Sequence, residues 1–202
     1  IRKAGSASLF SAEGPATYCP MRTFRCCWPT DEEADSVSGS LLERQTVVLT
    51  GASRGIGAAT ARLAAQRGAA VAITYGENAD AAHEVTSEII DLGGSAFALQ
   101  ADLSDGAQVE RLFREVDEFG TLCGLVNNAG ILESQARLDE MDGERLAQVF
   151  AVNITGSFLC AREAVRRMSN RHGGGGGAIV NLSSAASRLR SPHEFIDYAA
   201  SK

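Results

Sequence analysis

Residues 50–57 read T-G-A-S-R-G-I-G, and this stretch decides the fold. It follows a short apolar run and precedes an amphipathic one, as a strand–turn–helix unit requires. In that context Gly51 permits a tight turn, Gly55 lets the backbone approach a phosphate, and Gly57 allows close packing of a helix on a strand. The helix N-terminus adds free N–H groups and a positive dipole. The stretch therefore predicts a site for a dinucleotide's pyrophosphate, with a plain glycine-rich turn as the alternative.

The pattern on both sides of this turn is typical of an α/β protein. From Gln45 onward, short apolar runs alternate with amphipathic stretches, which predicts βαβ units around a parallel sheet. Strands are predicted at 46–50, 70–75, 96–101, 124–127 and 178–182. Helices are predicted at about 56–67, 79–92, 105–119 and 143–170, and glycines end the first three. The fold class that follows is a Rossmann-type doubly wound parallel sheet.

Residues 1–44 differ from the rest because they show neither helical nor strand periodicity. They are predicted to be a disordered N-terminal extension, and 45–202 a single nucleotide-binding domain. Before residue 31 the extension contains four basic residues, Arg2, Lys3, Arg22 and Arg25, against Glu13 as its only acid. An organellar transit peptide is therefore an alternative. Since the chain begins with Ile rather than Met, we expect its natural start to lie elsewhere.

The composition excludes several classes of protein. With 202 residues, 45% of them hydrophobic and 22% charged, the chain resembles a soluble globular domain. A formal charge of -6 argues against binding to nucleic acid or an anionic membrane, because those surfaces attract clustered Lys and Arg. Five cysteines without zinc-type spacing predict reduced thiols, no metal site and a cytoplasmic location. No apolar run reaches the length of a membrane-spanning helix.

The Gly-x-x-x-Gly-x-Gly spacing at 51–57 is the first of several motifs that occur in order. The others are Asn127-Asn128-Ala129-Gly130 at the end of the fourth strand, Asn153 in the fourth helix, Ser183-Ser184 after the fifth strand, and Tyr198-x-x-x-Lys202. Together they resemble the short-chain dehydrogenase/reductase family over 45–202, especially bacterial sugar-dehydrogenase-like and 3-oxoacyl-carrier-protein-reductase-like members. The resemblance implies hydride transfer between a nicotinamide cofactor and a carbonyl or secondary alcohol.

The catalytic set that the resemblance implies is Asn153, Ser184, Tyr198 and Lys202. A free tyrosine has a pKa of about 10 and is a poor base at neutral pH. Lys202 lies four residues beyond Tyr198, on the same helix face, so its ammonium favours the phenolate. Ser184 is expected to hydrogen-bond the substrate oxygen. Asn153 is expected to position a water in a proton relay to the lysine, with a plain helix contact as the alternative.

The choice of Ser184 over its neighbour Ser183 depends on spacing. Ser184 precedes Tyr198 by 14 positions, which is one more than in many family members. An insertion near Ser191-Pro192 would account for the extra residue, whereas Ser183 would require a longer one. We therefore expect Ser184 to be the catalytic hydroxyl.

The resemblance also implies a set of cofactor contacts. They are Gly51, Ser53, Arg54, Gly55, Ile56, Gly57, Tyr75, Asp102, Leu103, Asn128, Ala129, Gly130, Tyr198 and Lys202. Asp102 would contact the adenine, or alternatively cap the following helix. In NAD-preferring relatives an acid ends the second strand, whereas here that position is Tyr75, and Arg54 is placed to pair with a 2′-phosphate. NADP is therefore predicted rather than NAD, although Glu77 keeps NAD open.

Family members continue beyond the position of Lys202 with further strands. We therefore expect this sequence to be a fragment, with its fifth strand at the sheet edge, an incomplete catalytic helix and no activity of its own. The full-length protein is expected to form a homotetramer. The alternative is a non-catalytic nucleotide-binding module, which would have no use for the four catalytic residues. The substrate is expected to be a small carbonyl or alcohol compound of open identity.

Overall fold

The computed structural model of the chain describes residue 42, residues 45–189 and residues 194–202. The extension predicted for 1–44, apart from Leu42, and the loop at 191–192 lie outside the described residues. Leu42 packs against the core, and its carbonyl oxygen accepts the N–H of Gln45 at 3.0 Å. The contacts of the domain thus begin slightly before the first strand.

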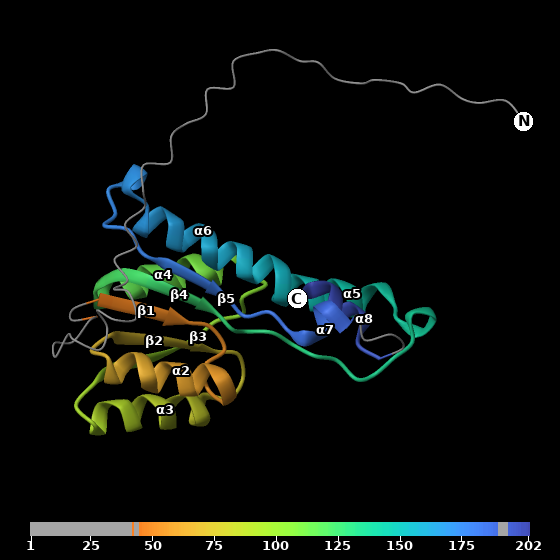
Figure 1. Cartoon of the computed structure of the whole chain (residues 1–202), viewed down its shortest axis with the longest axis horizontal. Coiled ribbons are helices and arrows are strands. Elements are labelled where there is room, and N and C mark those ends of the chain that lie inside the picture. The colour runs from red at the N-terminus through yellow and green to blue at the C-terminus, as the bar shows by residue number, and fades with distance from the viewer. Residues whose placement is uncertain (1–41, 43–44, 190–193) are drawn as a thin grey trace, which may run out of the picture.

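A five-stranded parallel sheet forms the centre of the molecule (Figure 1). Its strands are β1 (Gln45–Leu49), β2 (Ala70–Tyr75), β3 (Ser95–Gln100), β4 (Thr121–Asn127) and β5 (Ala178–Asn181), in the spatial order β3-β2-β1-β4-β5. The chain moves outward from β1 to β3, then crosses back to place β4 and β5 on the other side of β1. A ligand of such a sheet binds at the carboxyl ends of the strands, where this order reverses.

Helices cover both faces of the sheet (Figure 1). α2 (Gly55–Gln66) packs against α3 (Ala79–Asp91) on one face, and α4 (Gly106–Phe119) packs against α6 (Ser157–Met168) on the other. The shorter elements are η1 (Leu138–Glu140), α5 (Gly143–Phe150), η2 (Ala151–Gly156), η3 (Asn170–His172), α7 (Ala185–Leu189) and α8 (Ile196–Ser201). Within the described ranges, no helix is long and apolar enough to cross a membrane.

The core consists of two apolar layers, one on each face of the sheet. Successive residues of a strand point to opposite faces. Val48 accordingly joins Leu112 and Phe113 of α4, whereas Leu49 joins Ile73 and the residues under α2 and α3. The five side chains named here are at most 1% exposed. Burial on both faces explains why the strands are continuous apolar runs rather than alternating ones.

The predicted fold class is confirmed, and the predicted strands differ from the observed ones only at their ends. The largest such difference is β4, which begins at Thr121 rather than at residue 124. Gly68 and Gly93 follow α2 and α3 with φ of 88° and 83°, as predicted for glycines that end helices. Asp105 caps α4 by accepting the N–H of Ala107 at 2.8 Å. β5 lies at one edge of the sheet among the described strands.

The long helix predicted for about 143–170 is found as continuous helical backbone over 143–168, but it is not α-helical throughout. The backbone stays helical from α5 through α6, but η2 between them is a π-helical segment. α6 then ends at Met168, because Ser169 adopts extended backbone and its side chain caps η3 instead. The π-helical segment matters for the site because it carries Asn153.

Candidate cofactor and catalytic site

The turn after β1 is bonded directly to the neighbouring strand β2. Gly51 has φ of 61°, a left-handed conformation that favours glycine. Its N–H donates to Oγ1 of Thr74 at 3.1 Å, and the N–H of Ala52 donates to the Thr74 carbonyl oxygen at 3.0 Å. A Cβ at position 51 would lie 2.8 Å from Cα of Ala129. Gly51 thus makes the tight turn that the sequence predicts.

A second set of bonds joins this turn to the end of β4. The Thr50 hydroxyl oxygen accepts the N–H groups of Asn128 and Ala129, each at 3.0 Å. The Asn128 amide nitrogen donates to the carbonyl oxygens of Thr50 and Gly51, each at 2.8 Å. Sequence reasoning missed Thr50 and Thr74. The available signal was a hydroxyl residue just before Gly51 and another near the end of the adjacent strand.

The start of α2 fits an anionic ligand. Gly55 has φ of 58°, and a Cβ built there would meet nothing within 4 Å, so its backbone is open to a close approach. Arg54 is the N-cap residue and makes no side-chain cap bond, and the first turn contains no acid. The N–H groups at this helix start are therefore suited to phosphate oxygens. Gly57 instead faces inward, since a Cβ there would lie 2.6 Å from the Asn128 amide nitrogen.

The ends of β2 and β3 form the predicted adenosine side of the site. Tyr75 is half-buried, and its ring centroid lies 6.3 Å from that of His83 in α3. Asp102 is exposed, and its Oδ1 accepts the N–H and the hydroxyl of Ser104 at 2.9 and 2.7 Å. Asp102 therefore stabilises the turn before α4, although the N-cap itself is Asp105. The Leu103 side chain is buried in the core, which leaves its backbone for any ligand contact.

Lys202 and Tyr198 come together at the end of α8. The lysine Nζ lies 5.9 Å from the centroid of the Tyr198 ring and 3.5 Å from the Leu182 carbonyl oxygen. Burial lowers the pKa of the Lys202 ammonium. A Cβ at Gly130 would lie 3.0 Å from this Nζ and 3.3 Å from Oδ1 of Asn153. Gly130 from the loop after β4, Asn153 from η2 and Lys202 from the end of α8, all three predicted from the sequence, therefore meet around one point.

Asn153 is only 4% exposed, and its side-chain amide is fully engaged. Its Oδ1 accepts the N–H of Ile131 at 2.8 Å, and its Nδ2 donates to the Ile131 carbonyl oxygen at 3.0 Å and to the Ser201 hydroxyl at 2.9 Å. Asn153 thus fixes the loop after Gly130 to α8. Sequence reasoning missed Ser201, although it lies inside the Tyr198-x-x-x-Lys202 motif.

The two adjacent serines after β5 have different surroundings. The Ser183 hydroxyl lies 2.9 Å from the main-chain oxygen of Lys202, the last residue of the sequence, and 3.4 Å from the Ser187 hydroxyl. The Ser184 oxygen accepts the N–H of Ala186 at 3.2 Å, and no described residue accepts its proton. α7, which follows Ser184, packs against α8, but no hydrogen bond joins the Ser184 and Tyr198 hydroxyls in the described part of the chain. The difference in bonding favours Ser184 as the hydroxyl that can donate to a ligand.

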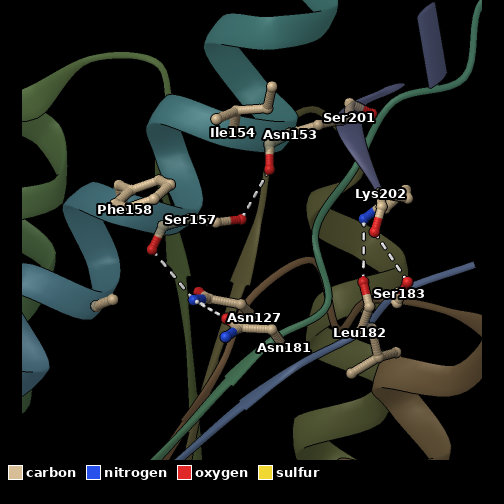
Figure 2. A pocket seen from close by; sticks show the side chains of 11 residues that line it. Asn127, Asn153, Ile154, Ser157, Phe158, Asn181, Leu182, Ser183, Ser201 and Lys202 are labelled. Carbon is tan, nitrogen blue, oxygen red and sulfur yellow. Dashed lines mark hydrogen bonds between the residues drawn. The ribbon is translucent and has the colours of Figure 1, made fainter. Parts of the chain in front are cut away.

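A cavity of about 240 Å³ lies behind Lys202, between α6 and the end of β5 (Figure 2). Asn153 and Lys202 line it, but neither the β1–α2 turn nor Tyr198 does. Asn127 also lines it and donates to the Ser157 carbonyl oxygen and to Oδ1 of Asn181, as Figure 2 shows. Asn127 therefore joins the end of β4 to β5 and to the start of α6. No group of three or more potential metal ligands occurs among the described residues.

The fold and the site together define a class of protein. It is a nucleotide-binding α/β domain with a glycine turn where the strand order reverses and a Tyr–Lys pair beside the neighbouring strand ends. The sequence model of the short chain dehydrogenase family matches residues 45–202. The chain therefore belongs to this family, as the motifs predict.

Known proteins of the family are similar along the same residues. The chain is 54% identical over 156 residues to the uncharacterized oxidoreductase YgfF of Escherichia coli (strain K12), covering 77% of this chain and 63% of that protein. It is 37% identical over 162 residues to a 3-oxoacyl-(acyl-carrier-protein) reductase of Synechocystis sp., covering 80% of this chain and 64% of that protein. The crystal structure of a dehydrogenase/reductase from Sinorhizobium meliloti 1021 matches with a TM-score of 0.73 and 40% sequence identity, covering 80% of this chain and 62% of that one. The chain thus spans about three-fifths of the length of these relatives.

Proposed function

We propose that the protein is an NADP-dependent oxidoreductase that transfers a hydride between the nicotinamide and a carbonyl or secondary alcohol of a small molecule. The observation that carries the proposal is the Lys202 ammonium, which lies 5.9 Å from the Tyr198 ring beside Gly130 and Asn153. These groups lie next to the strand ends that hold the nucleotide-binding turn. Membership of the short chain dehydrogenase family supports the reaction class.

Tyr198 acts as the acid and the base. In reduction its hydroxyl protonates the carbonyl oxygen, and in oxidation its phenolate removes the alcohol proton. The Lys202 ammonium stabilises the phenolate by its charge. Burial lowers the pKa of Lys202, so this ammonium releases a proton more readily than an exposed lysine does. Lys202 therefore also exchanges protons between the site and solvent.

Ser184 and Asn153 hold the reacting groups in place. The Ser184 hydroxyl donates a hydrogen bond to the substrate oxygen, where negative charge develops. Asn153 fixes the main chain of Ile131 and the Ser201 hydroxyl, and through them the surroundings of Lys202. A bound nicotinamide supplies or accepts the hydride. The chain's own residues supply orientation and the proton.

NADP is proposed as the cofactor because of the charges at the adenosine side. Arg54 is exposed at the start of α2, where its guanidinium can pair with a 2′-phosphate. The half-buried Tyr75 ends β2 where an acid would select NAD. The contacts proposed for the whole cofactor are Gly51, Ser53, Arg54, Gly55, Ile56, Gly57, Tyr75, Asp102, Leu103, Asn128, Ala129, Gly130, Tyr198 and Lys202.

We also propose that the natural full-length protein is a cytoplasmic homotetramer. Apolar side chains on α6 support association, since Phe158 is 72% and Val165 is 46% exposed. Cys123 and Cys160 are free, which is compatible with a reducing compartment. Light scattering of the purified protein tests the assembly, and a monomer at micromolar concentration would contradict it.

A substrate panel tests the reaction. The full-length protein is supplied with NADPH and a series of aldehydes, ketones and 3-oxoacyl thioesters, and with NADP and matching secondary alcohols, while cofactor absorbance is followed. Oxidation of NADPH that depends on one of these carbonyls supports the proposal. Tight NADPH binding with no turnover on any substrate would instead favour a non-catalytic nucleotide-binding module.

A further inference from the structure

A buried ion pair joins α5 to the helix that carries Tyr198. Nε of Arg145 lies 2.7 Å from Oδ2 of Asp197, and the two side chains are 15% and 1% exposed. Arg145 stands in the first turn of α5, and Asp197 immediately precedes Tyr198 in the first turn of α8. The pair is thus the direct link between the two helices next to the tyrosine.

The same carboxylate also holds the main chain of the tyrosine. Oδ1 of Asp197 accepts the N–H of Tyr198 at 2.9 Å, whereas the N-cap residue Phe195 offers no side-chain cap bond. At the other end, Oδ1 of Asp142 accepts the N–H of Arg145 at 2.8 Å. A continuous series of bonds therefore runs from the start of α5, through Arg145 and Asp197, to the backbone of Tyr198.

Both members of the pair are held in their charged forms. Burial acts to raise the pKa of Asp197, but the hydrogen bonds from Arg145 and from the Tyr198 N–H outweigh it and bring that pKa below its usual value. The hydrogen bond to Asp197 raises the pKa of Arg145. Nη2 of Arg145 is buried with no hydrogen-bond partner among the described residues, so this guanidinium depends mainly on Asp197.

We propose that Arg145 and Asp197 are positioning residues for the reaction: the pair fixes the first turn of α8 against α5 and thereby orients the Tyr198 hydroxyl. The proposal rests on the proposed role of Tyr198 as acid and base. The N-cap residue of α8, Phe195, makes no side-chain cap bond, so the orientation of the first turn depends on tertiary bonds. A misplacement of about 1 Å in a reacting group can cost roughly 100-fold in rate.

The test compares two arginines that each join two helices. Arg145→Met removes the link between α5 and α8, whereas Arg167→Met removes the Arg167–Asp117 pair between α6 and α4, whose Nε–Oδ1 distance is 2.6 Å, together with the pair between Arg167 and Glu163 within α6. In the full-length protein, Arg145→Met is expected to lower kcat about 100-fold while the Kd for NADPH stays close to the wild-type value. Arg167→Met is expected to lower the unfolding temperature without a comparable loss of kcat. Arg145→Lys, which keeps a cation near Asp197, should restore part of the rate.

The pH–rate profile for alcohol oxidation gives a readout that a merely structural pair would not move. Among the described residues, the charged groups on α8 and on the elements packed against it are Asp197 of α8 with Lys202 just after it, Glu144 and Arg145 of α5, and Arg188 of α7, with Glu133 and Asp142 near Arg145. Arg145→Met leaves the anion of Asp197, the residue before Tyr198, uncompensated, so the acidic limb moves to higher pH. Asp197→Asn leaves the cation uncompensated, so the limb moves to lower pH.

The outcomes separate this proposal from the one it rests on. If Tyr198→Phe kept its turnover, the role of the tyrosine itself would be wrong. If Tyr198→Phe were inactive but Arg145→Met matched Arg167→Met in kcat and left the pH profile unchanged, the positioning role alone would be overturned. A variant of Arg145 too unstable to purify leaves Arg145→Lys and Asp197→Asn, whose profiles answer the same question.

Discussion

The β1–α2 turn and α8 form the two halves of the site, and they are held in place by different kinds of bonds. At the turn, the bonds involve main-chain groups of Gly51, Ala52, Asn128 and Ala129. Two threonine hydroxyls also take part, and both residues, Thr50 and Thr74, are only 1% exposed. The turn is therefore part of the core of the sheet. Its geometry is fixed as soon as β1, β2 and β4 pair.

α8 packs against α5 and α7 and is held largely through side chains. Arg145 bonds Asp197, Asn153 bonds Ser201, and the Ser183 hydroxyl bonds the Lys202 carbonyl oxygen. Each bond comes from a different element. The comparison indicates that changes at the turn act on stability and cofactor binding, whereas changes around α8 act on the rate.

Tyr198→Phe has the largest expected effect and affects only the catalytic half. The ring and its contacts remain, but the transferable proton is lost. Loss of a general acid or base lowers kcat by about 1,000-fold, while the Kd for NADPH and the unfolding temperature should stay near wild type. Turnover assays measure kcat, and fluorescence titration measures the Kd for NADPH. A parallel loss of cofactor binding would mean that the two halves are not separable.

Gly51→Ala and Gly55→Ala sharpen the comparison within the turn. Both glycines have positive φ, but a Cβ at position 51 meets the Ala129 backbone at 2.8 Å, and a Cβ at position 55 meets nothing within 4 Å. We expect Gly51→Ala to lower the free energy of unfolding by about 2–4 kcal/mol and Gly55→Ala by about 1–2 kcal/mol. Urea denaturation measures both. Equal losses would contradict the view that the turn is part of the core.

Arg54→Ala tests the outer side of the turn. Arg54 is exposed, so its removal should leave stability unchanged. If its guanidinium pairs with the 2′-phosphate, the affinity for NADPH falls about 10–100-fold, as for loss of a charge-assisted hydrogen bond. The affinity for NADH should be unchanged. Titration calorimetry measures the Kd values for NADPH and NADH. Equal values for these two cofactors in the wild-type protein would refute the NADP preference.

The sequence predicted the turn better than it predicted the surroundings of α8. Strand–glycine–helix order depends on neighbouring residues, and a turn with positive φ strongly favours glycine, so it can be recognised in the sequence. The fold class and the roles of Gly51 and Gly57 could therefore be inferred from local pattern. Thr50 and Thr74 were missed because a hydroxyl at a strand end is common, and its partner lies on another strand.

The pair of Arg145 and Asp197 could not be inferred in the same way. The two residues are 52 positions apart, and an arginine in a first helical turn is usually exposed. The π-helical segment was also missed, because a shift in hydrogen-bond spacing leaves little trace in the apolar pattern. That segment carries Asn153, so local rules fail where the site imposes its own geometry.

Asp197→Asn tests whether the charge of α8 contributes to folding as well as to rate. The pKa of Asp197 in the folded protein lies below its usual value, because the bonds from Arg145 and from the Tyr198 N–H outweigh its burial. Its stabilisation is therefore fully present above the ordinary carboxyl pKa of about 4 and is lost as pH falls through the lower folded value.

The side-chain amide introduced by Asp197→Asn does not titrate. We expect wild type to be the more stable protein by urea denaturation at pH 7, and the difference should shrink steadily as pH is lowered below about 4. Arg167→Met, measured in the same series, shows how much acid sensitivity comes from ion pairs remote from α8. If the difference between wild type and Asp197→Asn stayed constant down to the lowest pH at which both fold, the carboxylate would act on rate alone.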